Sequence, residues 1–198
     1  MNYTIGISIR EDDFIKACID KDASALKILY EEHYSIMHPL CLRYANNTED
    51  AMDILHDGFI KVFKNIDKYQ VGTSLCAWIK RIMINTAIDY YRRESRRRCA
   101  DIDEVNHLYY DEADIVSKLS TEELLGALQT LSPGYRSVFN LYVIEGYSHK
   151  ELADILNITE STSRSNLVKA RSKLKEIIYK NYGNIYAQYA GIKERADP

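Results

Sequence analysis

The sequence predicts an all-α protein built from two small helical domains that are joined by an acidic linker. Proline occurs only three times and glycine eight times in 198 residues, so few positions interrupt a helix. Apolar residues recur at three- and four-residue spacing from Asp12 onward, which is the period of an amphipathic helix. Residues 99–117 contain six acids and no lysine or arginine, and this change of composition indicates the linker.

The N-terminal part of the chain predicts four helices, over residues 11–20, 23–45, 49–66 and 74–97. We expect Pro39 to kink the second helix and Thr48 to cap the third. The loop 67–73 contains Gly72, which tolerates turn conformations that other residues avoid. We therefore assign residues 1–21 to an N-terminal segment and residues 22–98 to the first domain.

The C-terminal part predicts three helices, over residues 121–130, 133–145 and 149–156, followed by a basic helix that begins after Thr159. Ser132 and Pro133 form a typical helix start, with a serine cap and proline at the first helical position. We expect a short helical piece at residues 105–110 within the linker. The second domain spans residues 118–178, and the tyrosine-rich C-terminal segment 179–198 has no role that the sequence indicates.

A helix-turn-helix is predicted in the second domain. Ser148 and Glu151 have the spacing of a capping box, Asn157 tolerates the left-handed conformation of a tight turn, and Thr159 is a good N-cap. No acid lies between Arg164 and Lys175 in the second helix, which is rich in bases. A recognition helix presents its N-terminal residues to the major groove, so DNA is the first partner to consider. An ordinary helical hairpin with a solvated basic face is the alternative.

Two faces of the first domain indicate partners. In residues 49–66, the face opposite the apolar stripe has acids around an exposed Ile60, which suits either docking of a basic helix or a plain solvated surface. In residues 74–97, bases along one side of the helix follow the pattern of phosphate contacts. Nearby aromatic side chains are candidates for stacking on unpaired bases, and Trp78 fits a core position better than a stacking one. These aromatic candidates are Tyr69, Trp78, Tyr90 and Tyr91.

Composition narrows the function classes. The net charge is −3 and the pI about 6.0, which argues against a purely electrostatic nucleic-acid binder. The chain lacks the pattern of a signal peptide and any apolar run long enough for a membrane span, so we expect a cytoplasmic protein without membrane insertion. No paired carboxylates, phosphate loop or nucleophile–base pattern indicates an enzyme or a cofactor. Cys18, Cys41, Cys76 and Cys99 lack metal-ligand spacing and are interpreted as free thiols, with no metal site.

Three segments in this order resemble the sigma factors of bacterial RNA polymerase, specifically the extracytoplasmic-function (ECF) group. They are residues 48–69, 74–98 and 131–174, of sequence TEDAMDILHDGFIKVFKNIDKY, SLCAWIKRIMINTAIDYYRRESRRR and LSPGYRSVFNLYVIEGYSHKELADILNITESTSRSNLVKARSKL. The resemblance implies binding to core RNA polymerase and promoter DNA, and commonly control by an anti-sigma factor. It also implies promoter-specific transcription initiation without catalysis by this chain.

The resemblance also implies roles for particular residues. Polymerase would bind Asp53, His56, Asp57 and Ile60. The −10 promoter element would meet the loop before the fourth helix and the basic helix itself, with Tyr69, Lys80, Arg81, Asn85, Arg92 and Arg93 as DNA-binding residues. The recognition helix would contact the −35 element through Thr159, Ser161, Thr162, Arg164, Ser165, Asn166, Lys169 and Arg171.

The chain departs from the family pattern at Ser163, where a buried valine is usual, so we expect the recognition helix to pack loosely or to be slightly rotated. The alternative function is a stand-alone helix-turn-helix regulator that binds operator DNA as a dimer. That alternative leaves the basic-aromatic helix of the first domain without a role.

Overall fold

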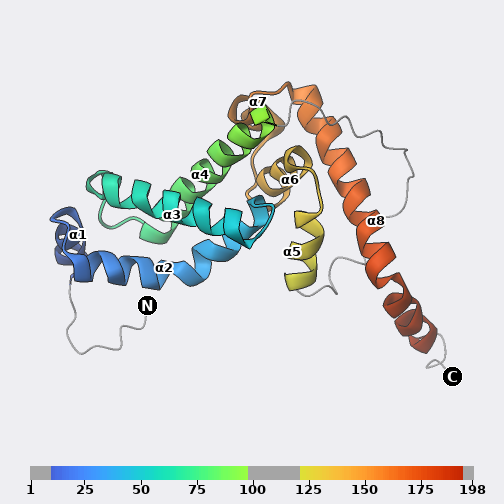
Figure 1. The fold of residues 1–198 in the computed structure, drawn as a ribbon, viewed down its shortest axis with the longest axis horizontal. Coiled ribbons are helices and arrows are strands. Elements are labelled where there is room, and N and C mark those ends of the chain that lie inside the picture. The colour runs from blue at the N-terminus through green and yellow to red at the C-terminus, as the bar shows by residue number, and fades with distance from the viewer. Residues whose placement is uncertain (1–9, 98–120, 194–198) are drawn as a thin grey trace. The chain divides into compact units, whose positions relative to one another are not determined.

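The computed structural model describes residues 10–97 and 121–193, and every regular element within them is helical (Figure 1). The predicted all-α class is therefore confirmed. The chain divides into two compact units, Met1–Tyr90 and Tyr91–Pro198. The predicted linker and its short helical piece lie outside the described residues, and the predicted domain boundaries stay a prediction. Among the described helices, none combines the length and the apolarity that crossing a bilayer requires.

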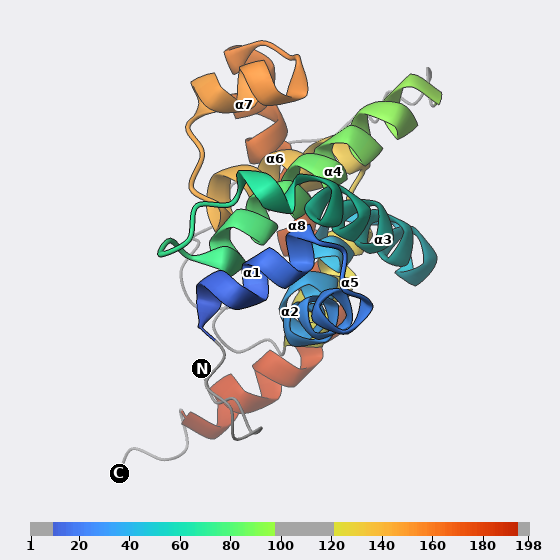
Figure 2. The same cartoon turned by 90° about the vertical axis from the view of Figure 1, so that its left-hand side faces the viewer.

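The described part of unit 1, residues 10–90, contains four helices and one 3-10 turn. They are α1 (Glu11–Ile19), α2 (Ala23–Tyr44), α3 (Thr48–Asn65), η1 (Ile66–Lys68) and most of α4 (Leu75–Arg97). Helices α2 and α3 run side by side, and α1 packs on both α2 and η1 (Figures 1 and 2). Pro39 is accommodated inside α2, which continues to Tyr44.

The core of unit 1 lies between α2, α3 and α4. On α3, the predicted apolar stripe is buried at Leu55, Phe59 and Val62 and continues to Ile66 of η1, whereas Met52 and Phe63 are only half-buried. From the other helices come the buried side chains Leu29, Met37, Leu40, Cys41, Ile79, Met83, Ile84 and Ile88. Burial of these apolar side chains is the main favourable contribution to the fold of this unit.

Helix α3 lies very close to α4 at Gly58. A β-carbon built on Gly58 would lie 2.2 Å from Met83 Sδ, well inside ordinary contact distance. Only the absence of a side chain lets the fully buried Met83 pack against the backbone of α3. This close packing fixes the spacing of the two helices that present the candidate binding residues of unit 1.

Helices α2 and α3 begin with side-chain caps. Asp22 caps α2, since its Oδ1 accepts a hydrogen bond from the amide of Ala25 at 2.8 Å. The expectation that Thr48 caps α3 is wrong, because Asn47 has the extended backbone of an N-cap and its Oδ1 accepts from the amide of Asp50 at 2.8 Å. Thr48 is already the first helical residue.

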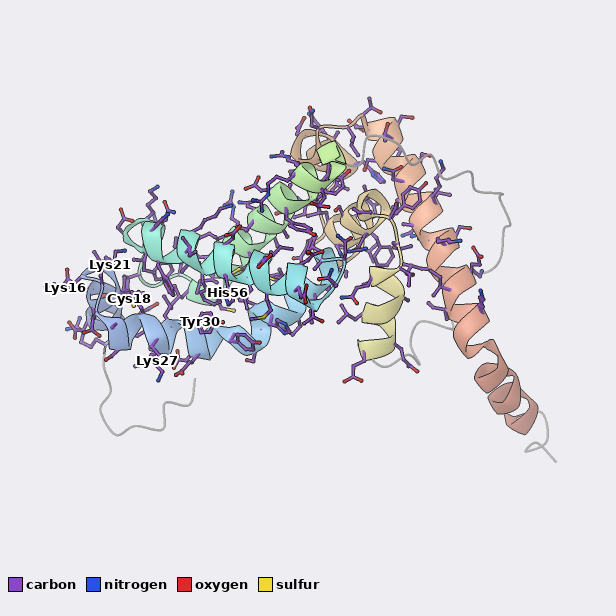
Figure 3. The ribbon with its side chains drawn as sticks, viewed as in Figure 1. Lys16, Cys18, Lys21, Lys27, Tyr30 and His56 are labelled. Atoms are coloured by element: carbon purple, nitrogen blue, oxygen red, sulfur yellow. The ribbon has the colours of Figure 1, made fainter. Side chains whose placement is uncertain are left out.

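The turn between α1 and α2 is tied to the end of α3. Lys21 adopts the left-handed conformation with φ 63°, and its Nζ donates a hydrogen bond to the carbonyl of Phe63. Carbonyls near a helix C-terminus lack partners within the helix, so a lysine there satisfies one of them. Lys16 and Lys21 lie at the end of unit 1 where α1 meets α2 (Figure 3).

Besides the last residues of α4, unit 2 contains five described helical elements. They are α5 (Thr121–Gln129), α6 (Pro133–Phe139), the π-helical turn η3 (Asn140–Ile144), α7 (His149–Leu156) and α8 (Glu160–Lys193). The predicted helix over 133–145 therefore ends in a wider turn. Helix α8 runs through residue 193, so the segment that begins at 179 is not a separate element.

A buried arginine stabilises the turn between α5 and α6. Arg136 is only 2% exposed, and its guanidinium donates to the carbonyls of Leu128, Gln129 and Leu131 at 2.8–3.0 Å. These carbonyls lie at the end of α5 and in the turn that follows, where helical hydrogen bonding stops, so the guanidinium satisfies acceptors that the helix does not. Beside this turn lies the apolar core of the unit, formed by Ala127, Leu128, Leu131, Ala170, Leu174 and Ile178.

Candidate nucleic-acid interface

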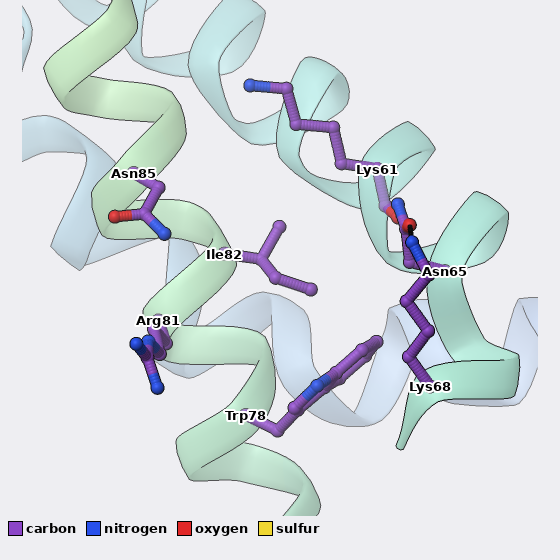
Figure 4. A pocket seen from close by; sticks show the side chains of 7 residues that line it. All are labelled: Lys61, Asn65, Lys68, Trp78, Arg81, Ile82 and Asn85. Carbon is purple, nitrogen blue, oxygen red and sulfur yellow. Dashed lines mark hydrogen bonds between the residues drawn. The ribbon is translucent and has the colours of Figure 1, made fainter.

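An open pocket of about 360 Å³ lies between the end of α3 and the first half of α4 (Figure 4). Trp78 and Ile82 point into it from α4, and Lys61 and Asn65 approach from α3. The full set of lining residues is Lys61, Asn65, Lys68, Trp78, Arg81, Ile82 and Asn85. The α4 members are spaced by three, one and three residues, so they form one stripe of that helix.

The pocket combines cations, amides and an aromatic ring. Lys68 Nζ donates to Asn65 Oδ1 at 2.6 Å, and Asn65 Nδ2 donates to the carbonyl of Lys61 at 2.8 Å, which orients the Asn65 side chain. Lys61 also forms an ion pair with Asp89 at 3.0 Å. Cations bind phosphates, amides bond base edges and an indole ring stacks on a base, so this set suits single-stranded nucleic acid.

Trp78 occupies a different position from the one that its spacing favoured. It is half-buried and lines the pocket, with its ring centroid 5.8 Å from that of Tyr69. The expectation that Trp78 belongs to the core is therefore wrong in part, because its ring contacts Tyr69 but is half-exposed and lines the pocket. A tryptophan held in this way presents a rigid stacking surface.

Tyr69 does not have the exposure that the expected stacking role requires. The side chain is 6% exposed, and its hydroxyl lies 2.8 Å from Glu11 Oε1 and 2.6 Å from the carbonyl of Thr73. Burial, first of all, and the neighbouring Glu11 raise the pKa of Tyr69 above its ordinary value. The prediction that Tyr69 contacts DNA directly does not fit this geometry, because its ring is buried and its hydroxyl is bonded within the loop.

The other predicted −10 residues lie along α4. Arg81 and Asn85 are exposed and line the pocket, whereas Lys80 is half-buried and lies outside it. Arg92 is half-buried and Arg93 exposed on the last turns of α4, beyond the end of unit 1 at Tyr90. The structure thus groups only two of the predicted residues in the pocket.

Sequence reasoning missed Lys61, Asn65 and Lys68 as pocket residues. Their four- and three-residue spacing places them on one side of a helix, and that spacing was available in the sequence. The pattern alone did not show that this side faces the stripe of α4 containing Trp78. Only the packing of α3 on α4 brings the two sets of side chains together.

The outer face of α3 has the exposure that docking requires. Asp53, His56, Asp57 and Ile60 are all exposed, and Ile60 has 47% of its surface accessible. Their spacing of three, one and three residues places them on one side of the helix, opposite the buried stripe. An exposed apolar residue surrounded by acids suits a partner helix that is basic and partly apolar.

The helix-turn-helix of unit 2 has the predicted caps. Ser148 Oγ accepts from the amide of Glu151, and Glu151 Oε2 accepts from the amide of Ser148 at 2.8 Å, so the capping box is confirmed. The amide of Ser148, first of all, and the Ser148 hydroxyl, which donates to the same carboxylate oxygen at 2.7 Å, lower the pKa of the Glu151 carboxyl. Asn157 has φ 54° and ψ 50°, as the turn requires, and Thr159 Oγ1 accepts from the amide of Thr162 at 3.0 Å.

The first turns of α8 present a polar and basic outer face. Its buried side is formed by Ser163, Leu167, Ala170, Leu174 and Ile178. On the other side, the predicted −35 residues are exposed except for two that are half-buried, Asn166 and Lys169. The exposed ones are Thr159, Ser161, Thr162, Arg164, Ser165 and Arg171.

Arg164 forms an ion pair with Glu160 one turn earlier on α8. Both side chains are about half exposed, and an ion pair of this kind contributes less than about 1 kcal/mol. Breaking this pair therefore costs little free energy. The pairing with Glu160 leaves about half of the Arg164 side chain exposed.

A polar pair joins α7 to the recognition helix. Ser163 is completely buried, and its Oγ lies 2.9 Å from His149 Nδ1, while Tyr142 stacks on the imidazole with centroids 4.3 Å apart. Burial, first of all, and the nearby Arg164 lower the pKa of His149. The loose packing expected at Ser163 is therefore replaced by a specific hydrogen bond. No group of three or more potential metal ligands occurs among the described residues.

Comparison with known protein families identifies the same two parts of the chain. The family model Sigma-70 region 2 matches residues 29–97, and the model Sigma-70, region 4 matches residues 121–174. The first match contains α3, α4 and the pocket, and the second contains the helix-turn-helix.

Individual relatives share these regions. The ECF RNA polymerase sigma factor SigE of Mycolicibacterium smegmatis is 31% identical over 164 residues, which are 77% of this chain and 61% of that protein. The ECF RNA polymerase sigma factor SigM of Mycobacterium tuberculosis is 25% identical over 86% of both chains. Among solved structures, the sigma factor RpoE of Bartonella quintana, in complex with the anti-sigma factor NepR, aligns at 21% identity with a TM-score of 0.46. That alignment covers 77% of this chain and 95% of the other.

Proposed function

The chain belongs to the ECF group of RNA polymerase sigma factors, and from this premise we propose that it binds core polymerase and directs initiation at promoters with −10 and −35 elements. One observation supports this most strongly: the chain has two dissimilar DNA-suited surfaces. One is a basic pocket with a tryptophan wall, and the other is the outer face of a recognition helix. A promoter being opened offers both single-stranded and duplex DNA to such a protein.

The pocket between α3 and α4 receives an unpaired base of the −10 element. Extruding a base from the duplex costs a few kcal/mol, which stacking and phosphate contacts must offset. Trp78 provides the ring, Lys68 and Arg81 provide the positive charge, and Asn85 provides hydrogen-bonding groups. Arg92 and Arg93 extend the basic surface along α4 toward its C-terminal end.

Helix α8 reads the −35 element in the major groove. Ser161, Thr162, Arg164 and Ser165 lie on its first two turns, where side chains of a recognition helix reach base edges. Lys169 and Arg171 lie farther along and contact phosphates. The amides of the first turn add the partial positive charge of a helix N-terminus.

The outer face of α3 binds the polymerase. Asp53 and Asp57 provide negative charge, and Ile60 provides the apolar centre that a stable contact needs. The chain itself catalyses no reaction in this scheme, since polymerase holds the active site, and it acts in the cytoplasm. An anti-sigma factor that covers these surfaces would hold it inactive.

A net charge of −3 fits a protein that binds promoters weakly by itself. Once polymerase fixes both units, binding of one promoter element raises the effective concentration of the other surface near its element. The alternative of a dimeric operator-binding regulator explains only the helix-turn-helix and leaves the match over residues 29–97 without a purpose.

The decisive experiment is transcription in vitro with the purified chain, sigma-free core polymerase and genomic fragments, followed by sequencing of RNA 5′ ends. Discrete start sites with two shared upstream elements are expected. The absence of such sites with a well-folded chain would refute the proposal.

Two double variants then separate the surfaces. Arg164→Ala with Lys169→Ala is expected to weaken initiation that depends on the −35 element while core binding stays normal. The matched control is Lys173→Ala, farther along α8, where the lysine pairs with Glu176 at 3.0 Å.

Asp53→Lys with Asp57→Lys is expected to abolish core binding and to leave the helix-turn-helix intact. Glu31→Lys with Glu32→Lys, two exposed acids on α2, controls for the change of charge. If both double variants failed at the same step, the division of roles between the two units would be wrong.

A further inference from the structure

The loop between η1 and α4 has a defined conformation. The amide of Thr73 donates to the carbonyl of Gln70 at 3.2 Å, and Gly72 has φ +86°, which together describe a type II turn. Thr73 Oγ1 donates to the same carbonyl at 2.7 Å, and Ser74 Oγ accepts from an amide in the first turn of α4 at 3.2 Å. Val71, at the tip of the turn, is 44% exposed.

Tyr69 holds this turn from beneath. Its hydroxyl has a single proton and lies within hydrogen-bond distance of two acceptors, the carbonyl of Thr73 at 2.6 Å and Glu11 Oε1 at 2.8 Å. The first contact closes the loop on itself, and the second joins the loop to α1, 58 residues earlier in the sequence. We call this three-residue arrangement of Glu11, Tyr69 and Thr73 the latch.

The latch also reaches the pocket. The ring of Tyr69 packs at a tilt of 58° against that of Trp78, with centroids 5.8 Å apart. The loop and the pocket tryptophan are therefore supported by the same buried side chain. A shift of Tyr69 would move both the turn and the stacking surface.

Helix α1 has no other assigned role. It lies before residue 29, where the Sigma-70 region 2 match begins, and none of the DNA or polymerase contacts proposed above lies on it. It nevertheless packs on η1, directly before the loop, and its first residue is Glu11.

We propose that Tyr69 is a positioning residue for opening of the −10 element, and that α1 acts through Glu11 as a brace that holds the loop and Trp78 in the conformation that receives the unpaired base. This inference rests on the proposed function. The physical reason is preorganisation: a loop ordered during folding does not have to be ordered when DNA binds, so less binding free energy is lost.

The proposal is tested with two variants and two matched controls. Tyr69→Phe removes the hydroxyl with its contacts to both acceptors and keeps the ring, while Glu11→Ala removes only the contact to α1. Asp12→Ala is the control for Glu11, since Asp12 is an exposed acid in the same helical turn that pairs with Arg10. Tyr34→Phe is the control for Tyr69, because the Tyr34 hydroxyl has only a 3.9 Å contact to Met52 Sδ.

The first measurement needs no polymerase. Trp78 is the only tryptophan in the chain, so acrylamide quenching of its fluorescence in the full-length protein reports on the loop and pocket. Quenching is expected to rise in Glu11→Ala and further in Tyr69→Phe, and to stay at the wild-type level in both controls. Equal quenching in all five proteins would overturn the latch.

The second measurement uses reconstituted holoenzyme and a promoter mapped as above, with 2-aminopurine in its −10 element. Tyr69→Phe is expected to lower the equilibrium constant for opening about fivefold, the effect of one net hydrogen bond, and Glu11→Ala to lower it less. Core binding and binding to a −35 duplex should not change. Glu11 is exposed, so that variant remains informative even if Tyr69→Phe folds poorly.

The outcomes separate the two proposals. A wild-type chain that opens no promoter would refute the proposed function, and the latch would fail with it. Normal opening by wild type together with equal opening by Tyr69→Phe and Glu11→Ala would overturn the latch alone. Equal losses in Glu11→Ala and Asp12→Ala would also overturn it, since general charge at α1 would then explain the effect.

Discussion

The contact between Gly58 and Met83 makes a quantitative prediction about the spacing of α3 and α4. In Gly58→Ala, the new β-carbon would lie 2.2 Å from Met83 Sδ and 3.0 Å from Met83 Cε, whereas ordinary contacts begin at 3.4 Å. The sulfur must therefore move by about 1 Å, and Met83 is completely buried, so no free space receives it. Because α3 and α4 form the two walls of the pocket, this change also perturbs the proposed −10 contact.

The size of the effect follows from two opposing contributions. Alanine is a better helix former than glycine by about 1 kcal/mol, and overpacking a core costs about 1–3 kcal/mol, with the upper end expected for a fully buried neighbour. We expect Gly58→Ala to destabilise unit 1 by about 2 kcal/mol. For a unit of this size, Met1–Tyr90, that lowers the melting temperature by about 10 °C.

Urea unfolding followed by the fluorescence of Trp78 isolates this effect, since the single tryptophan lies in unit 1. The control is Gly126→Ala in α5 of unit 2, where a β-carbon has nothing within 4 Å. Gly126→Ala is expected to leave the Trp78 transition unchanged and to stabilise unit 2 by up to about 1 kcal/mol, as seen by circular dichroism.

A second background tests the cause. Met83→Ala alone is expected to destabilise unit 1 by about 2–5 kcal/mol, because it leaves a cavity. In that background Gly58→Ala should become stabilising by about 1 kcal/mol, since the obstruction is gone and the helix propensity remains. If Gly58→Ala destabilised both backgrounds equally, the steric argument would be refuted.

Three further predictions concern the rest of the molecule. Replacing Arg136 by Met should destabilise unit 2 by about 3 kcal/mol in thermal unfolding, because the carbonyls of Leu128, Gln129 and Leu131 lose the guanidinium as a donor. Folding lowers the pKa of His149 from its ordinary 6.5, so unit 2 should be most stable above pH 6.5 and should lose stability as the pH falls below that value. The double variant His149→Phe with Ser163→Val should show a weaker pH dependence of stability in unfolding curves measured from pH 5 to 8. Burial raises the pKa of Cys41 to about 12. In a Cys99→Ser background, a thiol reagent at pH 8 should therefore modify the half-buried Cys76 before Cys41. Equal modification rates of Cys76 and Cys41 would contradict the burial of Cys41.

Local features were predictable because their causes are local. The capping box at Ser148 and Glu151, the left-handed Asn157 and the cap at Thr159 each depend on residues within four positions, and all three were confirmed. The cap of α3 was assigned one residue too late, because Asn47 and Thr48 are both good caps. The extended backbone of Asn47 decides between them.

Contacts between distant residues were not predictable in the same way. Tyr69 is an aromatic residue that could stack on a base, but it is buried and its hydroxyl contacts Glu11 and the carbonyl of Thr73. Nothing in the sequence around Tyr69 indicates that Glu11, 58 residues earlier, is its partner. From its sequence position, Ser163 predicts loose packing, whereas in the structure it is hydrogen-bonded to His149 of the preceding helix. A single sequence does not show whether a polar residue at a core position leaves a packing defect or forms a buried hydrogen bond.

The sequence by itself determined the helical class, the positions of most helices and the resemblance to ECF sigma factors, since periodicity, caps and ordered motifs are properties of short segments. The tertiary structure decided which side chains share a surface. It brought Lys61 and Asn65 opposite Trp78, and it moved Tyr69 from the surface into a supporting position. The physical reason is that helix packing, as at Gly58 and Met83, sets distances between faces, and a linear pattern contains no information about such distances.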